Sequence, residues 1–335
     1  MYATCRLILV TLLFIALTTT TLAEDWPQWR GPRATGVSSE TGLPTEWSES
    51  DKVAWKVQIR GLGISSPIVS GDRVFVTSQV GSGRSQRGPR LYQSGDAGGA
   101  GERALGSPCS GGRLGGTMGE GSVSFLVAAL DHSSGLKLWE YELRAEGRMP
   151  TVHEKHNLAT SSPVTDGERV YAWFGNGQIV ALDMNGELVW ERNLGTEYGP
   201  FSINWGHGSS PVVHEGTVIL LCYHERTSYL LALDSDTGRN QWKVDRPRGT
   251  LSYSKPLVAQ TPEPFEIIVN SSEGMAGHDA STGEVLWQIY GGNRFPIPMP
   301  IQHDGIIYAS RGYRSGPYMA LRPGGSGNVR DSHVL

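Results

Sequence analysis

The chain is organised as short apolar runs separated by Gly, Asp and Asn, and it has no long stretch of helical periodicity. The best example has four runs, at 159–165, 169–174, 178–183 and 187–193. Runs of this length, rich in Val, Ile and Tyr and bounded by turn residues, are typical of β-strands. The pattern returns after about 45 to 52 residues, and a period of this length with four strands indicates a propeller array rather than a helical solenoid.

A motif of the form Ala-x-Asp-x-x-Thr-Gly-x-x-x-Trp marks each period. Asp and Thr side chains can bond the local backbone and Gly can adopt positive φ, so the motif predicts a tight hairpin. The Trp that follows is predicted to fill a slot beside small residues of a neighbouring blade, which stabilises the fold by about 2 to 3 kcal/mol per ring. We therefore expect Trp55, Trp139, Trp190, Trp242 and Trp287 to be structural. The copies are Ala129, Asp131, Gly135 and Trp139; Ala181, Asp183, Gly186 and Trp190; Ala232, Asp234, Thr237, Gly238 and Trp242; and Ala276, Asp279, Thr282, Gly283 and Trp287.

Two further markers recur in fixed order. A Ser-Ser-Pro element precedes an apolar run, and a Gly-Asp or Asp-Gly turn lies between it and the motif. Because the serines recur once per blade, they indicate structure and not a unique catalytic serine. The Ser-Ser-Pro copies begin at Ser65, Ser161 and Ser209, with a degenerate copy at Ser254-Lys255-Pro256, and the turns lie at 71–76, 166–171 and 304–308.

This pattern resembles the PQQ-like (pyrroloquinoline-quinone) repeat of quinoprotein dehydrogenases and of the outer-membrane assembly lipoprotein of the β-barrel machinery. The resemblance covers nearly all of residues 52–335. The segments 25–32 (DWPQWRGP) and 42–47 (GLPTEW) resemble the lead-in of a secreted bacterial branch of that superfamily. It implies an all-β propeller of four-stranded blades, and it implies no particular reaction, because the repeat encodes blade packing.

Four full repeats run from about Ile64 to Tyr290, and a fifth begins near Ile297. Two arrangements are open. Either residues 52–59, with Trp55 at the Trp position, supply the last strand of a five-bladed ring, or the five blades are part of a seven- or eight-bladed ring. We favour the second, a truncated ring or an open arc, because a five-bladed ring would need every blade interface at a different angle.

The ends and insertions suggest a secreted or periplasmic protein. Arg6, the apolar stretch 7–17 and the small-residue exit at Ala23 predict a signal peptide over 1–23, with no retained transmembrane span. Residues 24–51 form an N-terminal lead-in, and residues 52–335 form the propeller. A Gly- and Arg-rich segment at 81–122 separates the second and third strands of the first blade and is predicted to be a surface loop, with a basic binding loop as the functional alternative.

The amino-acid composition and spacing argue against several classes of function. The formal net charge is −4 and the pI is about 6.1, so nothing attracts the whole chain to nucleic acid. After removal of the leader, Cys109 and Cys222 remain, and we expect two free thiols. The pair His153 and His156 has two intervening residues instead of the three that a helical zinc motif needs, so we assign it to a loop.

Polar residues before the innermost strands are the candidate ligand site. In a propeller these positions converge at one mouth of the central channel, where a cluster could bind a small ligand or a peptide loop. The alternative is a solvated rim without function. The candidates are His156, Asn157, Asn204, Trp205, His207, Tyr253 and Lys255.

The sequence favours a non-enzymatic binding scaffold that recognises a protein or small ligand, with no catalytic residues, no metal and no cofactor. One alternative is a PQQ-dependent oxidoreductase, for which the resemblance implies a Trp floor, a Ca²⁺ held by Glu, Asn and Asp, an Asp base and adjacent cysteines. Trp205 is the candidate floor residue in that case. The chain has no adjacent cysteines. A second alternative is an outer-membrane protein assembly factor.

Overall fold

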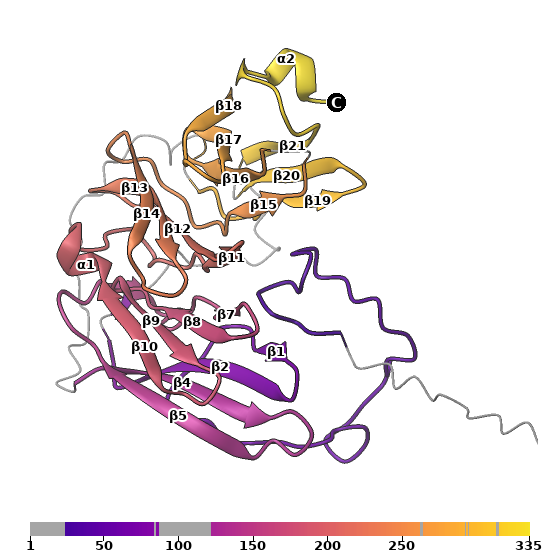
Figure 1. The fold of residues 1–335 in the computed structure, drawn as a ribbon, viewed down its shortest axis with the longest axis vertical. Helices are drawn as coiled ribbons and strands as arrows, with labels where there is room; N and C mark the ends of the chain where they lie inside the picture. Colours follow the sequence, from indigo (N-terminus) through magenta and orange to yellow (C-terminus); the bar gives the residue numbers. More distant parts are fainter. Residues whose placement is uncertain are drawn as a thin grey trace, which may run out of the picture.

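A computed structural model describes residues 24–83, 85–86, 122–261, 264–291, 293, 295–312 and 315–335. The described chain is almost entirely β-structure, with two single-turn helices. Its main sheets follow one another along a curve, from indigo and magenta at the bottom of Figure 1 to orange and yellow at the top. This arrangement confirms the predicted propeller architecture. The predicted signal peptide, most of the 81–122 insertion and Cys109 lie outside the described residues.

Each blade is an antiparallel meander whose strands lie close to the predicted runs. In the second blade, for example, the last three strands differ from the prediction by at most one residue at either end. The first blade contains β1 (Ile68–Ser70), β2 (Arg73–Val80), β4 (Ser124–Asp131) and β5 (Lys137–Arg144); the second β7 (Val164–Thr165), β8 (Arg169–Trp173), β9 (Gln178–Asp183) and β10 (Leu188–Asn193); the third β11 (Val212–His214), β12 (Thr217–Tyr223), β13 (Ser228–Asp234) and β14 (Asn240–Arg246); the fourth β15 (Leu257–Ala259), β16 (Glu266–Ser271), β17 (Gly274–Asp279), β18 (Val285–Tyr290) and the added β22 (Gly327–Asn328); and the fifth β19 (Ile301–His303), β20 (Ile306–Gly312) and β21 (Ser315–Leu321).

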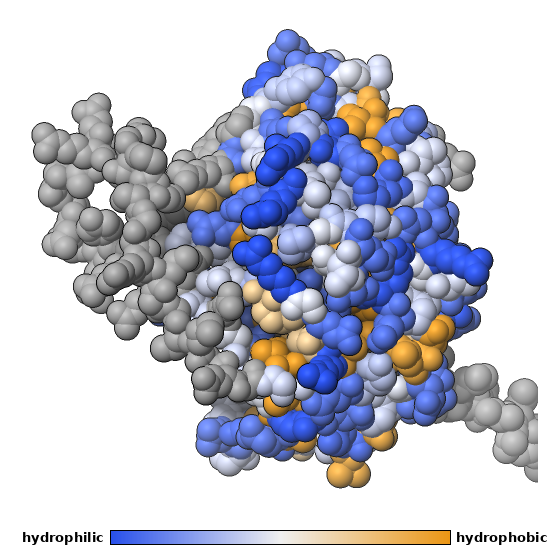
Figure 2. Space-filling view, turned by 90° about the vertical axis from the view of Figure 1, so that its left-hand side faces the viewer, coloured by the Kyte–Doolittle hydropathy of each residue, from blue (hydrophilic) through white to orange (hydrophobic). Residues whose placement is uncertain are grey.

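The remaining elements are small. They are β3 (Ser85–Gln86), which pairs with β6 (Val152–His153), and the helices α1 (Leu194–Glu197) and α2 (Arg330–His333). No helix in the described ranges has the length and apolar character needed to cross a bilayer. The outer face, which carries α1 and lies on the left of Figure 1, is mostly hydrophilic with separate small hydrophobic patches (Figure 2).

The core lies between blades rather than inside one of them. The first strand of each blade is the innermost, and β7 contacts both β1 and β11. Buried side chains form clusters between the first and second, second and third, third and fourth, and fourth and fifth blades. The three middle sheets therefore bury both faces against neighbouring sheets, and the first and fifth sheets each bury one face in this way.

The repeated hairpin is held by its own side chains. In the third blade the Asp234 carboxylate accepts bonds from the Thr237 amide (2.9 Å) and hydroxyl (2.6 Å), and Gly238 has a φ of +67°. A register shift follows in β13 and β14, next to the pair formed by Ala232 and Trp242. The small residue opposite the indole leaves room for the ring, which projects toward the next blade.

Four indole rings dock on the next hairpin in the same way. Each lies against the Gly of that hairpin, where a Cβ would come within 2.5 to 2.7 Å of the ring. Each indole N–H also donates to a carbonyl two or three residues before that Gly, at 2.8 to 3.2 Å. The ring, glycine and carbonyl residues are Trp55, Gly135 and His132; Trp139, Gly186 and Met184, which lies two residues before its Gly; Trp190, Gly238 and Ser235; and Trp242, Gly283 and Ala280.

Trp287 is different. Its cross-strand partner is Gly277 rather than Ala276, the residue that the sequence motif suggested. The ring packs over Gly277 of its own blade, and its N–H donates to the buried Glu266 carboxylate at 2.9 Å. This indole therefore packs within the fourth blade, and it also belongs to the buried cluster shared with the fifth blade.

The expected strand at 52–59 does not form, although Trp55 occupies a docking position. In the described residues the fifth sheet has three strands, and residues 52–59 do not pair with it. The arrangement in which 52–59 closes a five-bladed ring is therefore not observed, and the blades form an open arc. A strand needs a backbone partner, whereas the indole of Trp55 needs only the Gly135 hairpin.

The lead-in runs along the channel side of the innermost strands. Trp26 exchanges two backbone hydrogen bonds with Val69 of β1, both at 2.9 Å, and the Pro27 carbonyl accepts from Thr165 of β7 at 2.9 Å. Ala34 is buried in the cluster between the fourth and fifth blades. The lead-in thus spans most of the arc, and these contacts define the channel used below.

Candidate functional site

The loops before the five innermost strands are joined to one another at one mouth of the channel. The Asn157 side chain donates to the Leu62 carbonyl at 3.0 Å, which links the first two loops. The His153 amide donates to the Trp205 carbonyl at 3.1 Å, and the Tyr253 hydroxyl donates to the Asn204 carbonyl at 2.6 Å. The Tyr253 amide donates to the Pro296 carbonyl at 3.1 Å. Each loop is therefore braced by the next.

The accessible side chains of these loops form what we call the mouth cluster. Asn204 is exposed, and the other members are half-buried. The rings of His153 and Trp205 lie 5.4 Å apart at an interplanar angle of 59°. The mouth cluster consists of His153, His156, Asn204, Trp205 and Tyr253, of which His153 was not among the predicted site residues.

Trp205 has a strained backbone. Its φ is +78°, an uncommon conformation for a bulky residue that costs about 1 to 3 kcal/mol. The following Gly206 approaches the neighbouring loop so closely that a Cβ would lie 3.0 Å from the His156 ring. The turn thus holds a large indole at the mouth at an energetic cost.

Three of the predicted residues are buried and do not reach the surface of the mouth. Asn157 is used in loop bonds, because its side chain also accepts from the Ala159 amide at 2.8 Å. His207 is 1% exposed and its ring lies 4.4 Å from that of Trp173. Lys255 is 3% exposed and points toward the lead-in.

Burial also fixes the charge of two histidines. Loss of solvent lowers the pKa of His156 to about 4 and that of His207 to about 3. Both rings are consequently neutral near pH 7. Of these two rings, that of His156 belongs to the mouth cluster, to which it adds a neutral imidazole beside aromatic and amide groups.

Below the mouth, the second serine of each Ser-Ser-Pro element forms a ladder around the channel. The Ser66 amide donates to the Ser162 hydroxyl, and the Ser162 amide donates to the Ser210 hydroxyl, both at 3.0 Å. In the fourth blade this position is Lys255. Its ammonium group donates to the Gln28 side-chain oxygen of the lead-in.

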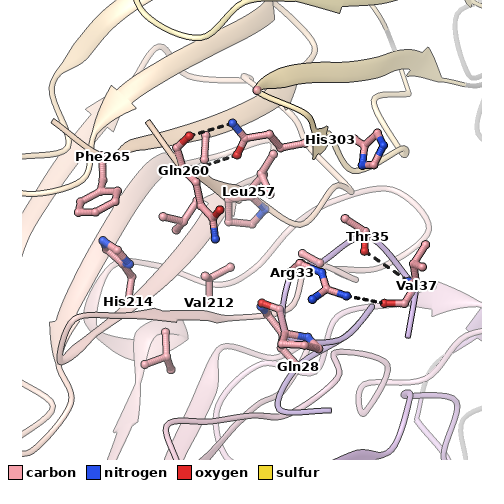
Figure 3. Close-up of a pocket in the computed structure, with 18 of the residues that line it drawn as sticks. Gln28, Arg33, Thr35, Val37, Val212, His214, Leu257, Gln260, Phe265 and His303 are labelled. Carbon is pink, nitrogen blue, oxygen red and sulfur yellow. Dashed lines mark hydrogen bonds between the residues drawn. The ribbon is translucent and has the colours of Figure 1, made fainter. Parts of the chain in front are cut away.

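A cavity of about 650 Å³ lies on the channel side, between the lead-in and the innermost strands β11, β15 and β19. Figure 3 shows Val212 and Leu257 within it and Phe265 and His214 at one side, where their rings lie 4.8 Å apart. Arg33 of the lead-in faces them across the cavity, and its guanidinium donates to the Val37 carbonyl at 3.4 Å. Sequence reasoning missed this site because the lead-in carries no repeat motif.

The cavity residues do not match the quinone site that the resemblance implies. Among the described lining residues, Asp304 is the single carboxylate, and it lies on a turn with its side chain 87% exposed. Phe265 is the single aromatic residue other than histidine in that lining, and Trp205 lies at the mouth against His153. A Glu, Asn and Asp set for Ca²⁺ over a Trp floor does not fit this lining.

The other sequence candidates are placed as follows. Cys222 is fully buried, and burial raises the pKa of its thiol. Its pairing with Cys109 is untested, because Cys109 lies outside the described residues. His153 ends β6, and the residues up to His156 form a turn in which the His156 amide donates to the His153 carbonyl at 2.8 Å.

The fold and its repeated indole docking define this protein as a PQQ-like β-propeller. Residues 33–197 and 123–313 match the family described as outer membrane protein assembly factor BamB, and the chain belongs to that family. A relative is the outer membrane protein assembly factor BamB of Yersinia pestis, which is 24% identical over 244 residues. That match covers 67% of this chain and 55% of the relative, so the chain spans about half the length of the curated relative it matches.

Two solved structures share the fold over most of the chain. The quinohemoprotein alcohol dehydrogenase of Comamonas testosteroni has a TM-score of 0.51 and 14% identity, and the match covers 89% of this chain and 47% of that one. A europium-containing methanol dehydrogenase has a TM-score of 0.51 and 13% identity, with coverage of 89% and 56%. At these identities the likeness concerns the fold alone.

Proposed function

We propose that this protein is a binding scaffold of the bacterial cell envelope, whose mouth cluster engages a protein partner. The observation that carries the proposal is the continuous bracing of the mouth loops. Bonds from Asn157 to Leu62, from Tyr253 to Asn204 and from Tyr253 to Pro296 hold these loops together before any partner arrives. Less conformational entropy is then lost on binding.

The chemistry of the mouth suits a polypeptide partner. Aromatic residues with a polar edge, such as Trp205 and Tyr253, are enriched where proteins bind one another. Asn204 and the neutral ring of His156 add hydrogen-bonding groups without a net charge. The family description, outer membrane protein assembly, supports an outer-membrane protein as the partner and a periplasmic location.

Site-specific crosslinking tests the proposal. A photo-reactive phenylalanine would replace Trp205, and a matched control would carry it at Leu188, which is 44% exposed on the outer strand β10. We expect a crosslink to an outer-membrane protein in detergent-solubilised envelopes from position 205 and not from position 188. Equal crosslinking from both positions, or none from 205, would refute binding at the mouth.

The oxidoreductase alternative has its own test. The purified chain would be incubated with PQQ and Ca²⁺ and assayed for dye-linked oxidation of alcohols and sugars. We expect no turnover above a control without PQQ, because the cavity lining lacks the implied metal ligands. Turnover that depends on PQQ would replace the scaffold proposal with an enzymatic function.

A further inference from the structure

Lys255 is a buried amine without a carboxylate partner in the described part of the chain. Its side chain is almost completely covered, and its ammonium group has one partner, the neutral Gln28 side-chain oxygen. Burial lowers the pKa of Lys255 to about 7, with no carboxylate acting in the opposite direction. A buried charge of this kind is costly unless it is paired, so its presence calls for an explanation.

The packing of the blades does not explain why a lysine is buried at position 255. The equivalent residues, Ser66, Ser162 and Ser210, are small and belong to the hydroxyl ladder of the channel wall. Lys255 cannot accept a bond from the Ser210 amide as a serine would, and it reaches across the channel instead. A lysine at position 255 therefore removes the hydrogen bond that a serine would accept from the Ser210 amide, and it places an ammonium group inside the channel.

Gln28, the residue that covers Lys255, has a defined side-chain orientation. The Gln28 amide nitrogen donates to the Pro32 carbonyl at 3.3 Å, so its oxygen faces Lys255. Replacing the Gln28 amide with a carboxylate would turn the bond to a neutral group into a buried ion pair, and it would remove the donor to the Pro32 carbonyl. Charge-assisted bonds of that kind are about twice as strong as neutral ones.

We propose that Lys255 is a carboxylate-binding subsite of the channel, that its ligand is an acidic side chain in an extended polypeptide, and that residues 25–34 occupy this site as a neutral substitute. The present occupant indicates why the ligand is a polypeptide. Trp26 and Pro27 of the lead-in bond through their backbones to β1 at Val69 and to β7 at Thr165, and the chain then turns from Gln28 onward. An incoming segment would use the same backbone groups and gain an ion pair.

The first experiment measures how firmly the lead-in is held in the full chain. Hydrogen exchange at the Trp26 amide, which donates to the Val69 carbonyl, reports release of the lead-in. At about pH 6, where Lys255 is protonated, we expect Gln28→Glu to slow this exchange about tenfold. In a Lys255→Met chain, or in Lys255→Gln if the first variant does not fold, the same change should give no protection. Equal effects in both backgrounds would overturn the proposal.

The second experiment presents the ligand as a separate molecule. Peptides of residues 24–37 with Glu or Gln at position 28 would be titrated against a full chain carrying Gln28→Ala. We expect the Glu peptide to bind about tenfold more tightly, and Lys255→Met to abolish the difference. Equal affinities of the Glu and Gln peptides, or binding of free glutarate as tight as that of the Glu peptide, would refute a polypeptide ligand. These readouts concern the channel alone and do not depend on binding at the mouth.

Discussion

The stability gained when a hairpin glycine packs against an indole ring can be measured separately from the cost of placing alanine at a positive φ. Gly238 and Gly216 lie in the same blade with nearly the same positive φ, +67° and +72°. A Cβ added at Gly238 would lie 2.7 Å from the Trp190 ring, whereas at Gly216 its nearest neighbour would be the Ser235 hydroxyl at an ordinary 3.7 Å. Replacing each with Ala gives a matched pair of variants.

The expected magnitudes differ because only one variant forces the ring to move. Gly216→Ala should lower the free energy of unfolding by about 1 to 2 kcal/mol, the cost of left-handed backbone for Ala. Gly238→Ala carries the same cost plus overpacking of about 1 to 3 kcal/mol. Displacement of Trp190 would also weaken its 2.8 Å bond to the Ser235 carbonyl, worth about 1 kcal/mol. The difference between the two variants should be about 2 to 4 kcal/mol.

Urea unfolding followed by circular dichroism measures both values. A Trp190→Leu chain supplies the second half of a double-mutant cycle, because a smaller side chain leaves room for the new Cβ. We expect Gly238→Ala to cost about 2 kcal/mol less in that background than in the natural chain. Equal destabilisation by the two glycine variants, or additive effects in the cycle, would refute the docking of the ring on the hairpin.

Three other outcomes follow from burial and charge. The free energy of unfolding should fall as the pH drops from about 6.5 to 4, because burial lowers the pKa of His156, His224 and His278 to about 4. The unfolded chain therefore binds protons at a higher pH than the folded chain does. Urea midpoints that stay constant over this pH range would contradict the claim that these rings are neutral in the folded chain. For Lys255 the pKa is lowered to about 7, so stability should rise between about pH 7 and 10.5, and this rise should be absent in Lys255→Met. Cys222 should react with a maleimide only after urea unfolding, as read by mass spectrometry of its peptide, since it is fully buried; labelling in the native chain would show that β12 opens.

The parts of the fold that could be predicted are those determined by neighbours in sequence. Asp234 and Thr237 bond to each other and to the adjacent backbone, and Gly238 supplies the turn. All of this chemistry is contained in one motif. The last three strand runs of the second blade were placed closely for the same reason, because each strand pairs with the next across a short turn. The first run was predicted at 159–165, and the strand covers only Val164–Thr165.

The parts that could not be predicted depend on partners far away in sequence. Residues 52–59 have the pattern of a strand, yet a strand forms only where another backbone is available, and Trp55 docks without one. The fourth blade has the same register as the third, so Gly277 takes the place that Ala232 has opposite its Trp, and aligning the motif copy at Ala276 places it one residue too early. The contact between Lys255 and Gln28 spans 227 residues, and a repeat motif cannot indicate a contact with a segment outside the repeat.

The mouth and the channel are joined by one short loop. Tyr253 donates to the Asn204 carbonyl at the mouth, and two residues later Lys255 reaches Gln28 in the channel. Between them Ser254 is held by the Pro298 carbonyl at 3.1 Å, so the loop has little freedom to let one end move alone. A partner that displaced Tyr253 would consequently disturb the contact between Lys255 and Gln28. An acidic segment that bound Lys255 would in turn shift Tyr253 at the mouth. Gln28→Glu can therefore be added to the chain that carries the photo-reactive probe at position 205. Because the loop links the two sites, we expect firmer binding of the lead-in to reduce the crosslinking yield at the mouth, and an unchanged yield would contradict this link.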